Sequence, residues 1–277
     1  MSVNGRAAID DGLMFSRLRQ MLGAAPQPPA AAIPAGERVY AIGDIHGRAD
    51  LLAALIAAID ADDAARATAR TTIILLGDLI DRGPDSAAVI QLARGWQQRR
   101  TVRILMGNHE EMFLDALEQE EVMRHFLRFG GREMLLSYPL DPMVYTRAEL
   151  ADVASLAREV IPDADIAFIR SFEDRIQIGD YLFVHAGIRP GTAIEAQRQS
   201  DMRWIREAFL DHPDSFGAVV VHGHTIFDSP QIRHNRIGID TGAYRSGRLT
   251  ALGLEGTNRW LLTSAAEDGA VRVQTEE

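Results

Sequence analysis

TTIILLGDLIDRG, which spans residues 71–83, decides the fold of this chain. Its first six residues are apolar or β-branched, a composition typical of a buried parallel strand. The strand would stop at Gly77-Asp78, which places Asp78 in the crevice at the carboxyl end of a sheet, where open α/β sheets bind ligands. We therefore expect Asp78 to belong to a functional site.

The same pattern occurs twice more. An apolar run at 39–42 leads into GDIHG (43–47), and one at 102–106 leads into GNHE (107–110). Each break precedes a helical pattern, so successive strand ends would share one sheet edge. The side chains predicted there are Asp44, His46, Asp78, Asn108 and His109. Carboxylate, amide and imidazole groups are the ligands that divalent metals prefer.

Composition indicates an ordinary globular protein. With 277 residues and 47% hydrophobic content, the chain can bury a full core as one large domain, with or without an insertion. It has no cysteine, which fits a reducing compartment and excludes thiolate zinc sites and cysteine nucleophiles. No long apolar segment or signal peptide is apparent, so we predict a cytoplasmic protein without stable membrane association.

The net charge of −10 argues against nucleic acid as a partner, since no basic stripe is present. An anion could still bind locally, because two divalent ions would reverse the sign of the potential inside a cleft.

The predicted organisation has three parts. Residues 1–35 would form an N-terminal arm with a Pro/Ala-rich linker, expected to be flexible, with one short amphipathic helix and Met14 as an alternative start. Residues 36–265 would form the main domain, interrupted at 118–172 by a helical, cap-like insertion. Residues 266–277 would be a C-terminal tail.

The second half of the chain reads as strands at 175–178, 181–184, 218–221, 236–239, 249–254 and 259–262. Gly179-Asp180 is a two-residue hairpin signal, so this half of the sheet is predicted to be antiparallel. Two strands end in histidine, in FVHAG (183–187) and GHT (223–225).

Each motif alone has a simpler interpretation. A Gly-Asp after a strand is often only a turn or helix cap, and a single His185 is typical of a hydrogen-bonded core histidine. The combination favours a site, because five strand ends carry a ligand type and five of the eight histidines fall on them.

The motifs GDIHG, GDLIDRG, GNHE, FVHAG and GHT resemble the calcineurin-like metallophosphoesterases, and within them the phosphoprotein phosphatase group with its bacterial and phage members. The resemblance covers about residues 37–255 in the family's order. It implies an α/β fold, a four-layer α-β-β-α sandwich of mixed sheets with a helical insertion, and a dinuclear metal centre between loops.

The resemblance also implies a ligand set for two divalent ions, most often manganese in vitro, with iron or zinc as alternatives. The first metal would be held by Asp44, His46 and Asp78, and the second by Asp78, Asn108, His185 and His224. Asp78 would bridge ions about 3.5 to 4 Å apart, and a bridging hydroxide would attack phosphorus.

Four further residues match catalytic positions of the family. His109 would be the general acid, and Asp81 would orient its ring and keep it protonated. Arg82 would clamp the phosphate, although a surface ion pair is the alternative, and Arg206 resembles a second phosphate arginine.

Three other residues have less defined roles. Arg189 could line the pocket or lie on the surface. His222 fits a supporting position behind the ligands. Asp240 lies in a further family block and is either a pocket residue or purely structural.

The predicted function is a metal-dependent phosphomonoesterase, a serine/threonine protein phosphatase with possible tyrosine activity, acting on a phosphorylated protein or small phosphoester. One alternative is a symmetrical diadenosine tetraphosphatase; those enzymes typically carry a small residue where this chain has Asp81. A catalytically silent interaction module is the alternative from another class, although it would be expected to have lost ligands.

Overall fold

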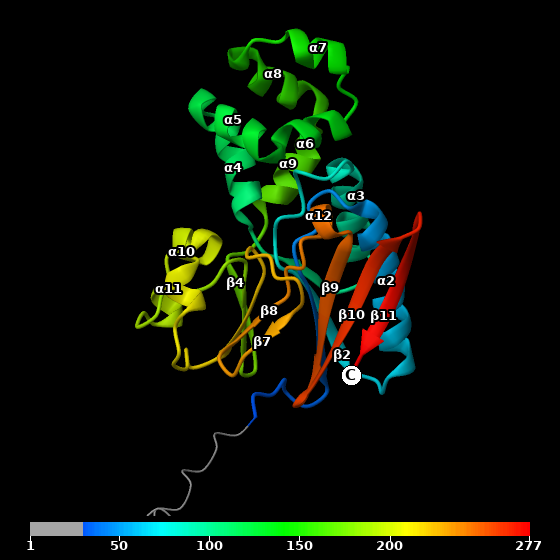
Figure 1. The fold of residues 1–277 in the computed structure, drawn as a ribbon, viewed down its shortest axis with the longest axis vertical. Helices are drawn as coiled ribbons and strands as arrows, with labels where there is room; N and C mark the ends of the chain where they lie inside the picture. The colour runs from blue at the N-terminus through cyan, green and yellow to red at the C-terminus, as the bar shows by residue number, and fades with distance from the viewer. Residues whose placement is uncertain (1–29) are drawn as a thin grey trace, which may run out of the picture. The chain divides into compact units, whose positions relative to one another are not determined.

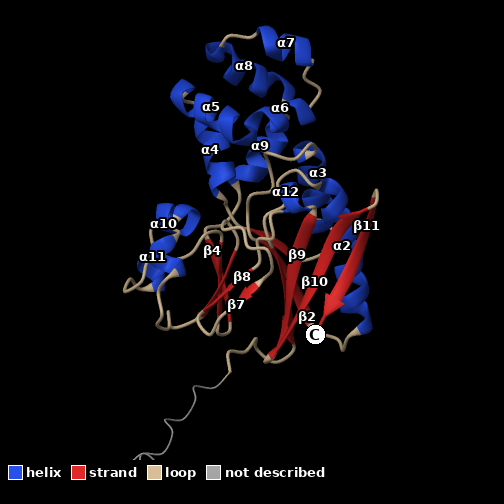
Figure 2. Cartoon of the chain, viewed as in Figure 1, coloured by secondary structure: helices blue, strands red, loops and turns tan. Residues whose placement is uncertain are grey.

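The computed structural model describes residues 30–277, of which residues 31–277 form one compact unit. Its strands form a six-stranded and a five-stranded sheet (Figure 2), which confirms the predicted α/β class with mixed sheets. The predicted N-terminal amphipathic helix and the alternative start at Met14 lie outside the described residues.

The six-stranded sheet contains the first and the last strand of the described residues. Its strands are β1 (Glu37–Ile42), β2 (Arg70–Leu75), β3 (Val102–Ile104), β9 (Arg248–Glu255), β10 (Asn258–Glu267) and β11 (Ala270–Glu276). They are arranged in the order β11-β10-β9-β1-β2-β3. β1, β2 and β3 run parallel, joined by α2 (Ala49–Ala65) and α3 (Ser86–Gln97), whereas β9 to β11 form an antiparallel meander beside β1. This arrangement brings the ends of the three parallel strands to one edge.

The five-stranded sheet corrects one prediction. Its strands are β4 (Arg175–Ile178), β5 (Tyr181–Val184), β6 (Val219–His222), β7 (Gln231–Ile232) and β8 (Arg236–Gly238). β4 and β5 form the predicted antiparallel hairpin, and β7 with β8 and β9 with β10 are also antiparallel, but β5, β6 and β8 run parallel, so the prediction of an antiparallel second half is wrong for these three strands. A turn signal determines only its own hairpin, and the 34 residues between Val184 and Val219 are long enough for the crossover that parallel neighbours need.

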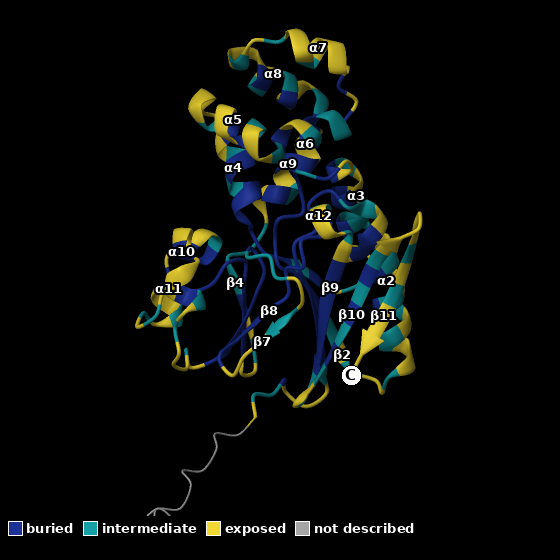
Figure 3. Cartoon of the chain, viewed as in Figure 1, coloured by how far each residue is buried: buried dark blue, intermediate teal, exposed yellow. Residues whose placement is uncertain are grey.

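The buried apolar side chains form three clusters that define the layers. Tyr40 and Ile42 of β1 face a cluster shared with α2, α3 and the helical insertion. Val39 and Ala41, on the opposite face of the strand, pack in a second cluster with Phe183 of the other sheet. The third cluster lies beyond that sheet and includes side chains of two short helices, α10 (Gln199–Trp204) and α11 (Glu207–Leu210). Two sheets thus pack face to face with helices outside. Strands β1, β5 and β9 are mostly buried, whereas β11 at the edge of its sheet is mostly exposed (Figure 3).

The helical insertion lies at the end of the sheets where the loops gather (Figure 1). It follows α4 (Asn108–Ala116) and consists of α5 (Glu120–Phe126), a π-helical turn η1 (Leu127–Gly131), α6 (Arg132–Ser137), α7 (Pro142–Arg147), α8 (Leu150–Val160) and α9 (Asp163–Arg170). Two further short elements are the 3-10 turn η2 (Ile194–Ala196) and α12 (Ala243–Ser246). Within residues 30–277, none of the helices is long and apolar enough to cross a membrane.

Both predicted ends of the main domain require correction. The predicted tail at 266–277 is largely β-strand, because β11 pairs with β10 from Ala270 opposite Glu267 to Glu276 opposite Leu261. The turn between them, Asp268-Gly269, has positive φ at both residues and a sequence that favours a tight hairpin. At the other end, the N–H of Ile33 donates to Gly256 O at 2.8 Å, so part of the predicted linker belongs to the folded unit.

Candidate metal centre

The predicted ligands come from the carboxyl ends of strands in both sheets. Asp44 and His46 follow β1, Asp78 follows β2, and Asn108 begins α4 after β3. The other sheet contributes His185 after β5 and His224 after β6. All six side chains are buried. Because parallel strands of the two facing sheets end in the same region, residues from positions 44 to 224 meet in one place.

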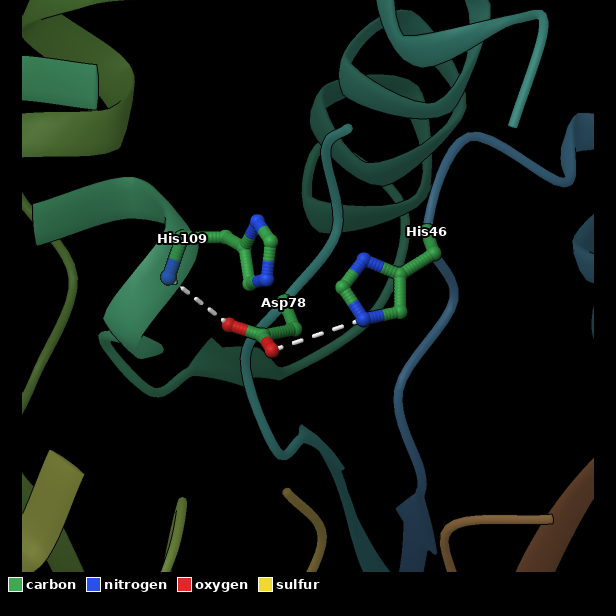
Figure 4. A group of neighbouring side chains, drawn as sticks. All are labelled: His46, Asp78 and His109. Atoms are coloured by element: carbon green, nitrogen blue, oxygen red, sulfur yellow. Dashed lines mark hydrogen bonds and ion pairs between the residues drawn. The ribbon is translucent and has the colours of Figure 1, made fainter. Parts of the chain in front are cut away.

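Asp78 is the centre of this cluster. Its Oδ2 lies 3.5 Å from His46 Nε2, and its Oδ1 lies 3.4 Å from His185 Nε2. Two groups of ligand atoms within 4.8 Å of one another share it: His46, Asp78 and His109, and Asp78, His185 and His224. Figure 4 shows the Asp78 carboxylate close to the His46 ring and accepting a hydrogen bond from the backbone N–H of His109. A single carboxylate therefore faces two possible cation positions.

Backbone carbonyls determine which nitrogen of each imidazole faces the cluster. His46 Nδ1 lies 2.8 Å from Ile80 O, and His185 Nδ1 lies 2.8 Å from Leu76 O. A carbonyl only accepts, so Nδ1 carries the proton and donates in both rings. The Nε2 atom of each ring then presents a lone pair toward Asp78, which is the tautomer a metal ligand needs.

A close pair of acceptor atoms indicates that a cation belongs here. His185 Nε2 lies 3.0 Å from Asn108 Oδ1, although neither atom has a proton to share when the ring is neutral. Burial lowers the pKa of His185 to about 4, which keeps the ring neutral near pH 7. His224 Nδ1 lies 2.7 Å from the same oxygen. A divalent ion placed among these atoms would satisfy all of them.

The buried carboxylates of Asp78 and Asp44 also indicate a site for cations. Burial raises the pKa of Asp78 to about 7. The pKa of Asp44 is raised well above its usual value, first by burial and then by the charges of Asp240 and Asp78. Buried carboxylates this close destabilise one another unless a cation neutralises them. The donor set therefore fits two hard or borderline divalent ions.

Asp44 has a contact that the sequence did not predict. Its two carboxylate oxygens accept from the backbone N–H of His224, at 3.0 and 3.2 Å. Asp44, which follows β1, is therefore hydrogen-bonded directly to His224, which follows β6 of the other sheet. The closely spaced group around His46 contains His109 rather than Asp44, so Asp44 approaches the cluster from the His224 side.

His109, Asp81 and Arg82 form a connected group beside the ligands. His109 Nδ1 lies 2.6 Å from Asp81 Oδ2, and both side chains are buried. Arg82 Nη2 donates to His109 Nε2 at 2.8 Å, and its Nη1 donates to His46 Nε2 at 3.1 Å. A guanidinium only donates, so His109 carries its proton on Nδ1 and presents a lone pair to Arg82.

The pKa of His109 is shifted in the direction opposite to the expectation. We expected Asp81 to keep the ring protonated, but burial lowers the pKa of His109 well below its usual value, and the nearby charges of His46 and Arg82 lower it further. Asp81 orients the ring. Protonation of Nε2 would require Arg82 to turn away from the ring.

Glu110 is the main site residue that the sequence analysis missed. Its buried carboxylate accepts from the backbone N–H of Asp78, Leu79 and Gly107 at 2.9, 2.7 and 3.0 Å. Asp78 itself has φ +49°, a conformation that a non-glycine residue keeps only when its surroundings hold it. Gly107 must be glycine, because a Cβ there would lie 2.2 Å from Asp78 Oδ1. The Glu of GNHE thus fixes the loops that carry Asp78 and Asn108.

We predict that Glu110→Gln weakens both the fold and the site. Glutamine keeps one acceptor oxygen but points an NH₂ group at backbone donors, which leaves a buried N–H unsatisfied at a cost of about 1–3 kcal/mol. Denaturant titration should show that loss, and equilibrium dialysis should show weaker binding of manganese. Glu133→Gln, a half-exposed control in α6, should change neither quantity. Unchanged stability and metal affinity in Glu110→Gln would contradict the role assigned to this carboxylate.

The remaining predicted residues are placed as follows. Arg206 is exposed at the start of α11, and its charge, after burial and His185, helps to lower the pKa of His224 to about 2. Arg189 forms a two-point ion pair with Asp201 at 3.0 and 2.6 Å, which fits a role on the surface rather than in the pocket. His222 is buried against Phe209 behind the ligands, and Asp240 lies beside Asp44 and accepts from Gly242 N at 2.8 Å.

Comparison with known proteins identifies the family. The family model described as calcineurin-like phosphoesterase matches residues 37–247. A bis(5'-nucleosyl)-tetraphosphatase, PrpE (asymmetrical), of Anoxybacillus flavithermus is 27% identical over 234 residues, which cover 76% of this chain and 88% of that protein. Serine/threonine-protein phosphatase 1 of Salmonella typhimurium is 26% identical over 218 residues, which cover 76% of this chain and 89% of that protein.

A solved structure shows the same fold. The cold-active protein-tyrosine phosphatase of a psychrophilic Shewanella species superimposes with a TM-score of 0.51. The match covers 92% of this chain and 87% of that one, at 19% sequence identity. Similarity at this level of identity concerns the arrangement of sheets and helices.

Proposed function

Because the chain belongs to the calcineurin-like phosphoesterase family, whose members are metal-dependent hydrolases with a dinuclear site, we propose that it dephosphorylates phosphoserine and phosphothreonine in proteins. The observation that carries this proposal is the buried pair of His109 and Asp81, whose side-chain atoms are 2.6 Å apart. A serine or threonine alkoxide is a poor leaving group and needs a proton as its bond to phosphorus breaks, and His109, oriented by Asp81, would supply it once its Nε2 has become protonated.

The chain's own residues account for the steps around that proton transfer. Asp44, His46 and Asp78 would hold one metal, and Asp78, Asn108, His185 and His224 the other. When bound, the metals, proposed to be manganese in vitro, supply an activated water as nucleophile and polarise the phosphoryl group. Arg82 exchanges its contacts with His46 and His109 for two phosphate oxygens, which frees His109 Nε2 to take up a proton from solvent and to donate it to the leaving serine or threonine oxygen.

A second candidate, hydrolysis of bis(5'-nucleosyl) tetraphosphates, is favoured by the relative from Anoxybacillus, which the match covers over 88% of its length. Cleavage of a polyphosphate releases a phosphate group that leaves readily without a proton. The two candidates therefore differ in how much they need His109.

A substrate panel tests the proposal. Purified full-length protein with manganese should have its highest kcat/KM on phosphoserine and phosphothreonine peptides, above phosphotyrosine peptides and diadenosine tetraphosphate. Chelation should abolish turnover, and manganese should restore it. A preference for the tetraphosphate would support the second candidate, and its products would distinguish symmetrical cleavage into two ADP from asymmetrical cleavage into ATP and AMP. Full activity after verified removal of metal would overturn both.

We predict that Arg82→Ala lowers kcat by about 10²–10³-fold, the usual effect of losing one preorganised donor to transition-state charge. Metal content should remain near that of the wild type, because Arg82 is not a ligand. Arg189→Ala, which removes an arginine paired on the surface, is the matched control and should retain full turnover. A normal rate in Arg82→Ala at saturating substrate would assign this residue to a structural role instead.

A further inference from the structure

Arg82 is contacted directly by the helical insertion. The backbone N–H of Arg82 donates to Gly130 O at 3.1 Å, and Gly130 belongs to η1, the π-helical turn between α5 and α6. Arg82 has φ +67°, a left-handed conformation that an arginine rarely adopts without support. The hydrogen bond from the insertion is one of the contacts that hold it.

The packing around this bond leaves no room for a side chain at position 130. A Cβ on Gly130 would lie 2.4 Å from Arg82 N and 2.7 Å from Arg82 Cγ. Gly130 also has φ +110°, outside the range that other residues adopt. Glycine at this position therefore allows the insertion to press its backbone against the backbone and side-chain stem of Arg82.

The other side of η1 is anchored inside the insertion. A Cβ on Gly131 would lie 2.4 Å from the ring of Phe126, and Phe126 is fully buried in the cluster that the insertion shares with α2 and α3. The helical path is interrupted at Phe129, with φ −101° and ψ 16°, and at Gly130. The turn is thus fixed between a packed core and Arg82.

We propose that η1, through Gly130, positions Arg82 for phosphate binding, so that the helical insertion is part of the catalytic apparatus as well as a cover for the strand ends. The inference rests on the proposed function only in taking Arg82 as the phosphate-binding arginine. Gly130 itself is a positioning residue, since it acts through Arg82.

The test is a double-mutant cycle between Gly130→Ala and Arg82→Ala with a nitrophenyl phosphate substrate and manganese. Gly130→Ala should displace Arg82 and thereby lower kcat by about 10- to 100-fold with little change in KM, because small errors of placement reduce transition-state contacts most. In the Arg82→Ala background, the same Gly130→Ala change should have almost no further effect. Bound manganese should be unchanged throughout.

Two glycine controls separate positioning from general destabilisation. Gly95→Ala in α3, where an added Cβ meets nothing within 4 Å, should be silent. Gly131→Ala disturbs the core of the insertion beside Phe126, and its loss of thermal stability provides the comparison for a structural defect. If Gly130→Ala fails to fold, Phe126→Leu, which loosens the anchor of η1, replaces it in the same cycle.

The possible results distinguish this inference from the proposed function. If Arg82→Ala impairs turnover and Gly130→Ala does not, the positioning role is refuted while the proposed function stands. If Gly130→Ala impairs turnover equally with and without Arg82, its effect does not pass through Arg82, and the inference is refuted. A normal rate in Arg82→Ala refutes the inference, because Arg82 would then not bind phosphate, whereas the proposed function is still judged by the substrate panel and the His109 variants.

Discussion

Asp78→Asn should abolish hydrolysis more completely than any other single ligand substitution. The carboxylate lies within 3.5 Å of His46 Nε2 and 3.4 Å of His185 Nε2, so one change weakens both halves of the cluster. Asparagine keeps one oxygen but loses the negative charge that balances two cations. A loss of several kcal/mol in transition-state stabilisation corresponds to about 10³-fold or more in kcat.

The measurement for Asp78→Asn combines turnover with metal analysis after dialysis. The variant should retain its fold and bind at most one weakly held manganese ion. Asp165→Asn is a matched control, because Asp165 is equally buried but pairs with Arg94 in a different part of the molecule. That control should lose stability without losing metal. Two tightly bound ions in an active Asp78→Asn protein would refute the bridging role.

His109→Asn should retain both metals and lose activity in a way that depends on the leaving group. Positioned acid catalysis contributes about 10²–10⁴-fold, and a serine alkoxide needs it far more than nitrophenolate does. We therefore expect a large loss on a phosphoserine peptide and a small one on nitrophenyl phosphate. Asp81→Asn should show the same bias more weakly, because Asp81 orients the ring through Nδ1 without touching the substrate.

Equal losses of His109→Asn on the two substrates, with metals still bound, would mean that His109 acts on the nucleophile or on phosphate charge. A small loss on the phosphoserine peptide, together with high activity on diadenosine tetraphosphate, would instead favour the second candidate function, whose leaving group departs without a proton.

The location of the site followed from the sequence because each predicted ligand comes immediately after a strand. Apolar runs ending in Gly-Asp or Gly-Asn determine where a strand stops, and parallel strands stop at a common edge. The structure brings Asp78, His46, His185 and His224 together for this reason. The family match adds support over residues 37–247.

Other features depend on contacts between segments far apart in the chain. The carboxylate of Glu110 reaches backbone donors at Asp78 and Leu79, about 30 residues earlier, and no local pattern announces such a contact. The parallel pairing of β5 with β6 depends on the path of the intervening chain. The contact of Gly130 with Arg82 is invisible in sequence for the same reason, since Gly130-Gly131 reads only as a break between helices.

The most direct test of the central claim is a crystal structure of the protein grown with manganese, with the ions located by their anomalous scattering. We predict two peaks about 3.5 to 4 Å apart with Asp78 coordinating both, His46 and Asp44 on one, and Asn108, His185 and His224 on the other. A single peak, or two peaks of which only one contacts Asp78, would contradict the dinuclear centre proposed here.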